Sequence, residues 1–160
     1  MHIRTATIND LAAIAAIEQR CFPPNEAASY DCLSERLRIF PTHFWLLERD
    51  NRLLGFINGM VTDRQTIDDE MFKNAGLHDR QGKWQSVFGL AVAPEYRKKG
   101  YAGKLLDHLI AQARKQNKTG VTLTCKEHLI DYYQKFGFRD SGIGHSTHGG
   151  ETWHDMILTL

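Results

Sequence analysis

The sequence has little cysteine, almost no net charge and no long apolar run, and each shortage narrows what the protein can be. Its three cysteines, Cys21, Cys32 and Cys125, form no C-x-x-C pair, which argues against a disulfide framework and a thiolate zinc site. Twenty Lys and Arg against nineteen Asp and Glu leave a net charge of +1, so we expect neither nucleic acid nor an anionic membrane as a partner. No segment approaches the roughly 18 consecutive apolar residues of a membrane span.

Length and composition fit one globular domain. The 160 residues, 42% hydrophobic and 24% charged, suffice for one hydrophobic core, and no repeat, low-complexity tract or linker divides them. We therefore expect a single domain over residues 1–160. Residues 1–6 lack the basic and then apolar pattern of a secretory signal, so we expect a cytoplasmic protein.

The first part of the chain predicts a strand, two helices and a hairpin. Thr7 and Asp10 have the spacing of a capping box, which marks the start of a helix that should end before Pro23. Two apolar runs flanking a polar segment are the pattern of a hairpin. The buried stripe of the first helix comprises Leu11, Ile14, Ala15 and Glu18. The other expected elements are a strand at 3–7, a helix at 29–40 and hairpin strands at 44–47 and 53–57.

The second part of the chain alternates strands with helices. A strand-like segment, a turn, a helix with a leucine-rich face and a β-branched strand indicate a β-α-β unit with a parallel strand pair. The polar residues 62–83 form a connection longer than ordinary loops between elements. Such long connections usually have a function, so we expect a binding loop or lid here. The sequence thus predicts a mixed α/β fold with one central sheet. The remaining expected elements are strands at 84–92, 121–124 and 152–160, a helix through 105–113, and helices at 68–72 and 126–135.

Residues 90–106 carry the strongest functional signal. An apolar strand runs into a turn rich in small residues and then into a helix N-terminus, where free amide hydrogens and the helix dipole form an anion site. The basic residues 97–99 add formal charge, and Gly100, Ala102 and Gly103 leave the backbone open to a phosphate. The alternative is a solvated, charged turn. Walker and dinucleotide glycine patterns are both absent, so we expect a pyrophosphate bound in another way.

Two motifs resemble those of the GNAT N-acetyltransferase family. Residues 97–102 read R-x-x-G-x-A after an apolar strand, which is similar to that family's acetyl-coenzyme A signature, [RQ]-x-x-G-x-[GA]. Residues 132–138 contain its second hallmark, Y-x-x-x-G-F. The expected order of elements is similar over nearly the whole chain. Within the family, the arylalkylamine N-acetyltransferases are the nearest resemblance, through residues 22–26, the L-A-V strand and residues 125–138.

The resemblance implies the α/β (α+β) GNAT fold, with a mixed central sheet of about six to seven strands flanked by about four helices. It also implies acetyl-coenzyme A as co-substrate and no metal. In such enzymes the signature strand polarises the thioester carbonyl, and the loop at 98–103 holds the pyrophosphate. The cofactor-binding residues that it implies are Leu90, Ala91, Val92, Arg97, Lys98, Lys99, Gly100, Tyr101, Ala102, Gly103, Lys104 and Tyr133.

The resemblance implies that Tyr133 lies beside the reacting thioester. A phenol with an ordinary pKa of about 10 stays protonated at neutral pH, so it can give a proton to the departing thiolate of coenzyme A. The motif makes Tyr133 the general acid, whereas Tyr132 falls one position too early and is expected to pack. The alternative for Tyr133 is aromatic packing beside Phe136 and Phe138.

The base that deprotonates the amine is indicated by resemblance only. Vertebrate arylalkylamine N-acetyltransferases use two histidines on the signature strand, and this sequence has Ser86 and Phe88 at the matching positions. Glu26 is similar to the glutamate base of the insect branch. An ordered water chain could serve as the base instead. The alternative for Glu26 is then a solvent-facing residue in the first turn of the second helix. If Glu26 is the base, Glu26→Gln should lower the rate most at acidic to neutral pH.

The sequence contains one histidine cluster, His145-x-x-His148 with His154 nearby. Neighbouring glycines favour a loop or hairpin, and neither an H-E-x-x-H pattern nor a cysteine accompanies the cluster. We expect a loop on the substrate side and no metal site.

Residues and resemblance together predict an N-acetyltransferase that moves the acetyl group of acetyl-coenzyme A to a primary amine by direct attack in a ternary complex. The expected acceptor is a small arylalkylamine-like or polyamine-like molecule. The alternatives are a protein or peptide N-acetyltransferase and a non-catalytic acyl-coenzyme A sensor. Monomer and homodimer both stay open, because the exposed tail strand could pair with another subunit or simply close the sheet.

Overall fold

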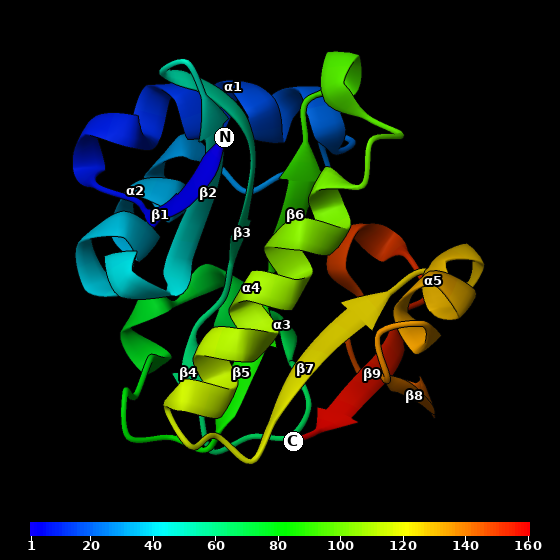
Figure 1. Cartoon of the computed structure of the whole chain (residues 1–160). Helices are drawn as coiled ribbons and strands as arrows, with labels where there is room; N and C mark the ends of the chain where they lie inside the picture. Colours follow the sequence, from blue (N-terminus) through cyan, green and yellow to red (C-terminus); the bar gives the residue numbers. More distant parts are fainter.

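The computed structural model describes residues 1–160, and its elements confirm a mixed α/β fold (Figure 1). The helices are α1 (Leu11–Cys21), α2 (Tyr30–Ile39), α3 (Asp69–Lys73), α4 (Tyr101–Lys115) and α5 (Ile130–Gln134). The strands are β1 (His2–Thr5), β2 (Phe44–Arg49), β3 (Arg52–Asn58), β4 (Val61–Thr62), β5 (Trp84–Val87), β6 (Gly89–Val92), β7 (Gly120–Cys125), β8 (Arg139–Ile143) and β9 (His154–Thr159).

The strands are divided between two sheets, where the sequence predicted one. The four-stranded sheet has the order β1-β2-β3-β6 and is antiparallel throughout. The five-stranded sheet has the order β4-β5-β7-β9-β8, and its single parallel pair is β5 with β7. That pair confirms the predicted β-α-β unit, because α4 lies between β6 and β7 in the chain.

The division of the sheets begins at Phe88, inside the segment 84–92 that was predicted as one strand. Before it, β5 pairs with β7 up to the partners Val87 and Leu123. At Phe88 the backbone turns to the other sheet, and its N–H donates to Asn58 O at 2.7 Å. β6 then continues as the partner of β3. An unbroken apolar run gives no sign of such a change of partner, so the sequence predicted a single strand here.

The N-terminal elements confirm the local signals. Thr7 N donates to Asp10 Oδ2 at 2.8 Å, in a short 3-10 turn that leads into α1. Ser29 caps α2, because its Oγ accepts from Cys32 N at 3.1 Å. The hairpin turn between β2 and β3 consists of Asp50 and Asn51, both with positive φ (52° and 63°), which suits the twist of the two strands.

Two features of the second half differ from expectation, and the tail strand confirms one of its two alternatives, that of closing the sheet. The polar connection contains the two-residue strand β4 as well as the short helix α3. The glycine-rich segment after α5 supplies a further strand, β8. The tail strand β9 is no exposed edge, because it pairs with β7 on one side and β8 on the other. It therefore closes the sheet and offers no edge to another subunit.

Helices cover both faces of the sheets. α1 and α2 pack with Phe44, Leu46 and Phe56 in one hydrophobic cluster, and α4 packs in another with residues of β2, β3, β7 and β9. Figure 1 shows α4 crossing in front of the strands with α1 and α2 on the other side. The buried stripe of α4 consists of Leu105, Leu106, Leu109, Ile110 and Ala113.

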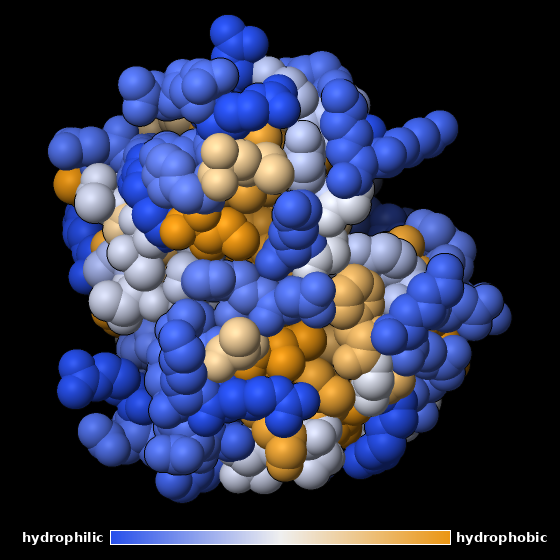
Figure 2. All heavy atoms as spheres, in the orientation of Figure 1, coloured by the Kyte–Doolittle hydropathy of each residue, from blue (hydrophilic) through white to orange (hydrophobic).

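The surface of the face shown in Figure 2 is mostly hydrophilic, with small hydrophobic areas between charged side chains. None of the helices combines the length and the apolar character needed to cross a membrane.

Candidate active site

The two sheets diverge between β6 and β7, and this leaves one side of β6 unpaired. β6 is the edge strand of its sheet, and its only strand partner is β3. Ala93 N donates to Leu54 O at 2.9 Å. Since antiparallel partners alternate, the amides of Leu90 and Val92 point the other way, toward β7. The backbone of the predicted signature strand therefore faces the gap between the sheets.

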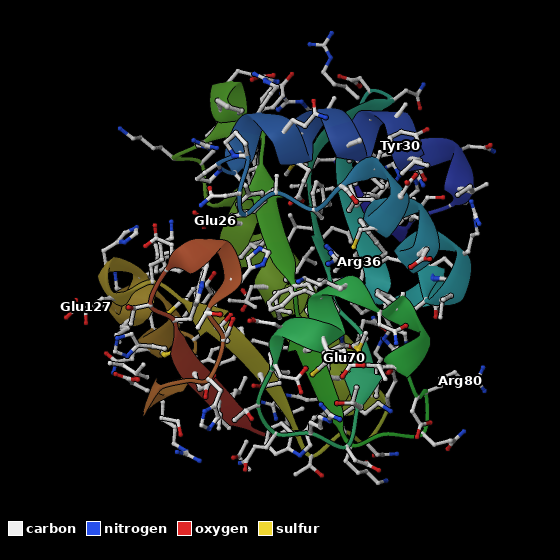
Figure 3. The ribbon with its side chains drawn as sticks, turned by 180° about the vertical axis from the view of Figure 1, so that it is seen from behind. Glu26, Tyr30, Arg36, Glu70, Arg80 and Glu127 are labelled. Atoms are coloured by element: carbon white, nitrogen blue, oxygen red, sulfur yellow. The ribbon has the colours of Figure 1, made fainter.

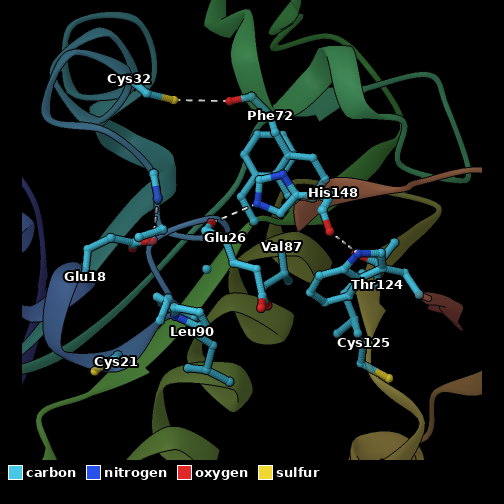
Figure 4. Close-up of a pocket in the computed structure, with 18 of the residues that line it drawn as sticks. Glu18, Cys21, Glu26, Cys32, Phe72, Val87, Leu90, Thr124, Cys125 and His148 are labelled. Atoms are coloured by element: carbon cyan, nitrogen blue, oxygen red, sulfur yellow. Dashed lines mark hydrogen bonds between the residues drawn. The ribbon is translucent and has the colours of Figure 1, made fainter. Parts of the chain in front are cut away.

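A cavity of about 670 Å³ lies at this gap. Its walls come from the segment between α1 and α2, the junction of β5 and β6, the end of β7, α5, and residues near 148–153. Figure 4 shows Glu18, Glu26 and His148 directed toward it from three different segments. Its volume lies in the range of small-molecule sites, about 300–1,000 Å³.

The predicted phosphate loop presents free backbone amides. After the 3-10 turn Pro94–Tyr96, the chain passes through Lys98 (φ 64°) and Gly100 (φ 81°) into α4. The N–H groups of residues 98–103 have no acceptor within the protein, and the first bonded amide is that of Lys104, which donates to Gly100 O at 3.2 Å. Six unpaired amides at the positive end of a 15-residue helix form an anion site.

Two glycines shape this loop in different ways. Gly100 has the left-handed conformation that favours glycine, although no atom lies within 4 Å of where its β-carbon would be. A β-carbon on Gly103 would lie 3.4 Å from Phe136 Cζ, so the first turn of α4 approaches α5 closely. Gly100 thus sets the direction of the chain, and Gly103 sets the distance between the helix and α5.

The side chains predicted at the cofactor have mixed roles. Arg97 Nε donates to Val92 O at 3.1 Å, so this side chain ties the loop to the end of β6. Tyr101 Oη accepts from Arg49 at 3.4 Å and therefore points toward the β2–β3 hairpin. Lys98 and Lys99 are exposed and make no hydrogen bond or ion pair, which leaves their charges available.

Tyr133 lines the cavity, whereas Tyr132 does not. The Tyr133 ring packs edge-on against Tyr132 and Phe138 at centroid distances of 5.2 and 6.0 Å, and its hydroxyl has no hydrogen-bond partner in the protein. Burial, followed by the charges of Cys125 and Tyr132, raises the pKa of the Tyr133 phenol well above its ordinary value. The phenol is therefore a protonated group at the cavity over the whole physiological pH range.

Glu26 lies before α2 begins, so the alternative of a first-turn, solvent-facing glutamate is wrong. Its side chain is 7% exposed, and its Oε2 lies 3.0 Å from Lys126 Nζ. The backbone oxygen of Glu26 contacts His148 Nε2 at 2.8 Å (Figure 4). The carboxylate thus reaches the cavity, but the ammonium group of Lys126 already compensates its charge.

The two positions that match the histidines of the vertebrate branch lie apart. Ser86 is buried outside the cavity and donates to Met60 O at 2.7 Å. Phe88 lines the cavity, with Phe72 at a centroid distance of 5.0 Å. Neither side chain can accept the proton of an ammonium group at the cavity.

The histidine cluster separates in space. His148 lines the cavity and stacks on Phe72 at 5.1 Å, as expected of a substrate-side loop, while His154 Nδ1 lies 3.2 Å from Asp140 on the neighbouring strand. No group of three or more His, Cys, Asp or Glu side chains is placed to hold a metal ion.

Sequence reasoning did not assign a role to Glu18. It stands on the buried face of α1, lines the cavity and is 5% exposed. Burial raises the pKa of its carboxyl, against the opposing hydrogen bond from Ala28 N. The signal was present, because an acidic residue on an apolar helical stripe is seldom buried without a reason.

Comparison with known proteins agrees with this architecture. Serotonin N-acetyltransferase of Mesocricetus auratus is 29% identical over 115 residues, which are 69% of this chain and 53% of that protein, so the chain spans about half the length of this relative. The structure of the GNAT-like decarboxylase GphF in complex with isobutyryl-CoA is similar, with a TM-score of 0.82, 22% identity and 99% of each chain covered. The loading GNATL domain of CurA from Lyngbya majuscula has a TM-score of 0.84 at 14% identity, with 99% of this chain and 96% of that chain covered.

The family model described as "Acetyltransferase (GNAT) family" matches residues 11–138. That range holds the unpaired edge of β6, the loop of free amides and Tyr133. The chain belongs to the GNAT acetyltransferase family.

Proposed function

We propose that this protein transfers the acetyl group of acetyl-coenzyme A to a primary amine. One observation carries the proposal: the six unpaired amides of residues 98–103 lie at the end of β6, whose own unpaired edge leads from them to the cavity. A diphosphate at the loop and a pantetheine arm along the strand would use both sets of backbone groups. The thioester would then lie beside Tyr133.

The proposed reaction is a direct attack of the amine on the thioester carbonyl. Binding both substrates side by side removes much of the entropic barrier, so no covalent enzyme intermediate is needed. An amide of Leu90 or Val92 would stabilise the developing oxyanion. As the C–S bond breaks, Tyr133 would give its proton to the thiolate, and its raised pKa keeps that proton in place until then.

The shape of the acceptor side favours a small amine over a peptide. A peptide would need an open groove between residues 22–29 and 145–150. Two contacts bridge these segments: Asn25 Nδ2 donates to Gly149 O at 2.7 Å, and His148 Nε2 contacts Glu26 O at 2.8 Å. Aromatic side chains line the cavity, among them Phe22, Phe72, Phe88 and Trp153. These features support an arylalkylamine-like acceptor better than an extended chain.

A base at the cavity must take one proton from the substrate ammonium before the amine can attack. The assignment of Glu26 stays a prediction, supported by its place at the cavity and weakened by its ion pair with Lys126.

A thiol-release assay tests the proposed function. Wild type would be mixed with acetyl-coenzyme A and, in turn, phenethylamine, tryptamine, putrescine, spermidine and a peptide with a free N-terminus. We expect release of coenzyme A with at least one small amine and little with the peptide. Tight binding of coenzyme A with no release for any acceptor would favour the sensor alternative, and release with the peptide alone would favour the protein acetyltransferase.

A further inference from the structure

One carboxylate at the cavity has an oxygen without a partner. Glu18 Oε2 accepts from Ala28 N at 2.9 Å, whereas Glu18 Oε1 has no hydrogen-bond partner although the residue is only 5% exposed. Asn58 on β3 is fully buried, and its Nδ2 is equally without a partner. Such atoms are rare in folded proteins, because each loses its hydration without compensation. A functional role would account for both.

Both atoms face the same space beside Gly89, where β5 passes into β6. A β-carbon on Gly89 would lie 3.2 Å from Asn58 Nδ2 and 3.8 Å from Glu18 Oε1, so the missing side chain leaves this space open. One of the two atoms is a donor and the other is an acceptor. A water molecule between them would accept from Asn58, donate to Glu18 and keep a further site for a substrate group.

The cations around Glu18 are engaged elsewhere. Arg36 of α2 donates to Asn58 Oδ1 at 3.1 Å and to Phe72 O at 3.0 Å, and it forms no ion pair with Glu18. Figure 3 shows Arg36 inside the molecule, unlike Arg80 at the periphery. His148, the other charged or titratable group that acts on Glu18, directs its Nε2 to the backbone of Glu26. Arg36 and His148 thus act on Glu18 without a direct contact, and they lower the pKa of its carboxyl less than burial raises it.

We propose that Glu18 is the proton acceptor for the substrate ammonium, reached through the space beside Gly89. This inference rests on the proposed acetyl transfer and assigns the base within it. Gly89 directly precedes Leu90, whose amide faces the gap where the thioester carbonyl would lie. Glu18 therefore stands beside the reacting carbon on the side of α1 and α2, and Tyr133 approaches from α5. The raised pKa of Glu18 makes it a stronger base than an exposed glutamate.

The protons balance as follows. The ammonium gives one proton to Glu18 and becomes a neutral amine, whose lone pair forms the C–N bond. The intermediate collapses with cleavage of the C–S bond, and the thiolate takes the proton of Tyr133. The nitrogen loses its second proton, which restores the Tyr133 phenol, and Glu18 releases the first proton to solvent. The sum is one amide, one free thiol and one proton.

The test is the pH dependence of kcat/KM in Glu18→Gln. The glutamine keeps an oxygen for Ala28 N but cannot take a proton. At pH 7 we expect a fall in kcat/KM of at least tenfold, within the range of about 10²–10⁴ for general base catalysis. The deficit should shrink as the pH approaches the amine's own pKa of about 10, because free amine then needs no base. The acidic break of the wild-type profile should disappear.

Two controls separate a base from a structural residue. Glu127→Gln makes the same change at an exposed position outside the cavity and should keep kcat/KM within twofold. The affinity of Glu18→Gln for coenzyme A, measured by calorimetry, should equal that of wild type. An active Glu18→Gln with kcat/KM within threefold of wild type and an unmoved acidic break would overturn the assignment. So would a pH-independent loss accompanied by a lower melting temperature. A wild type that acetylates no amine would remove the proposed function itself, and this inference with it.

Discussion

Tyr133→Phe separates chemistry from packing, because the substitution removes one hydroxyl and leaves the ring. The Tyr133 hydroxyl has no hydrogen-bond partner in the protein, and the ring contacts with Tyr132 and Phe138 persist in phenylalanine. We therefore expect the free energy of unfolding to change by less than about 1 kcal/mol, since no intramolecular hydrogen bond is broken. Loss of a general acid lowers kcat by about 10²–10⁴, which corresponds to roughly 3–5 kcal/mol in the barrier.

The assay is steady-state thiol release at saturating acetyl-coenzyme A and amine, together with calorimetry of coenzyme A binding. Tyr133→Phe should lower kcat over the whole pH range from 6 to 9 and leave the dissociation constant unchanged, because a phenol with a raised pKa is protonated throughout. Tyr132→Phe is the matched control, since that ring does not line the cavity. A kcat of Tyr133→Phe within threefold of wild type would refute the reasoning and leave Tyr133 as a packing residue.

Three further outcomes follow from the geometry. Gly100→Ala should lower the free energy of unfolding by about 1–2 kcal/mol, because Gly100 has φ 81°; an unchanged urea midpoint would contradict this. Glu26→Gln should keep the acidic break of the rate profile, because Lys126 already compensates the Glu26 carboxylate; loss of the break would return the role of base to Glu26. Glu18 has a pKa raised above its ordinary 4.5, so its contribution to stability is present below that value and is lost as pH rises through the folded-state pKa. Urea unfolding at pH 4 and pH 8 should therefore show the stability of Glu18→Gln rising relative to wild type with pH, and a constant difference would count against a buried, unpaired carboxylate.

Local signals in the sequence were sufficient for the loop and for most elements around it. The capping spacing of Thr7 and Asp10 and the stripe of α4 depend on neighbours within a few residues, and both are confirmed. The loop before α4 could also be predicted, because its signal lies within a few residues. A turn directly before a helix start leaves the first amides of the helix without acceptors.

Features that depend on distant pairing were not predictable in this way. The division of the sheets at Phe88 requires knowledge that Asn58 accepts its amide hydrogen. The ion pair of Glu26 joins residues 100 positions apart. The sequence placed Glu18 on the buried stripe of α1. That its Oε1 lacks a hydrogen-bond partner could be seen only in the fold, which places Asn58 and Gly89 beside it.

The most direct test of the account compares coenzyme A, 4′-phosphopantetheine and pantetheine by titration calorimetry with wild type. If the amides of residues 98–103 bind the diphosphate, two charge-assisted hydrogen bonds of about 1.5 kcal/mol each make coenzyme A bind more than about 100-fold more tightly than pantetheine. The monophosphate should lie between them. No heat with coenzyme A, or equal affinities for coenzyme A and pantetheine, would contradict the binding of a diphosphate at this loop.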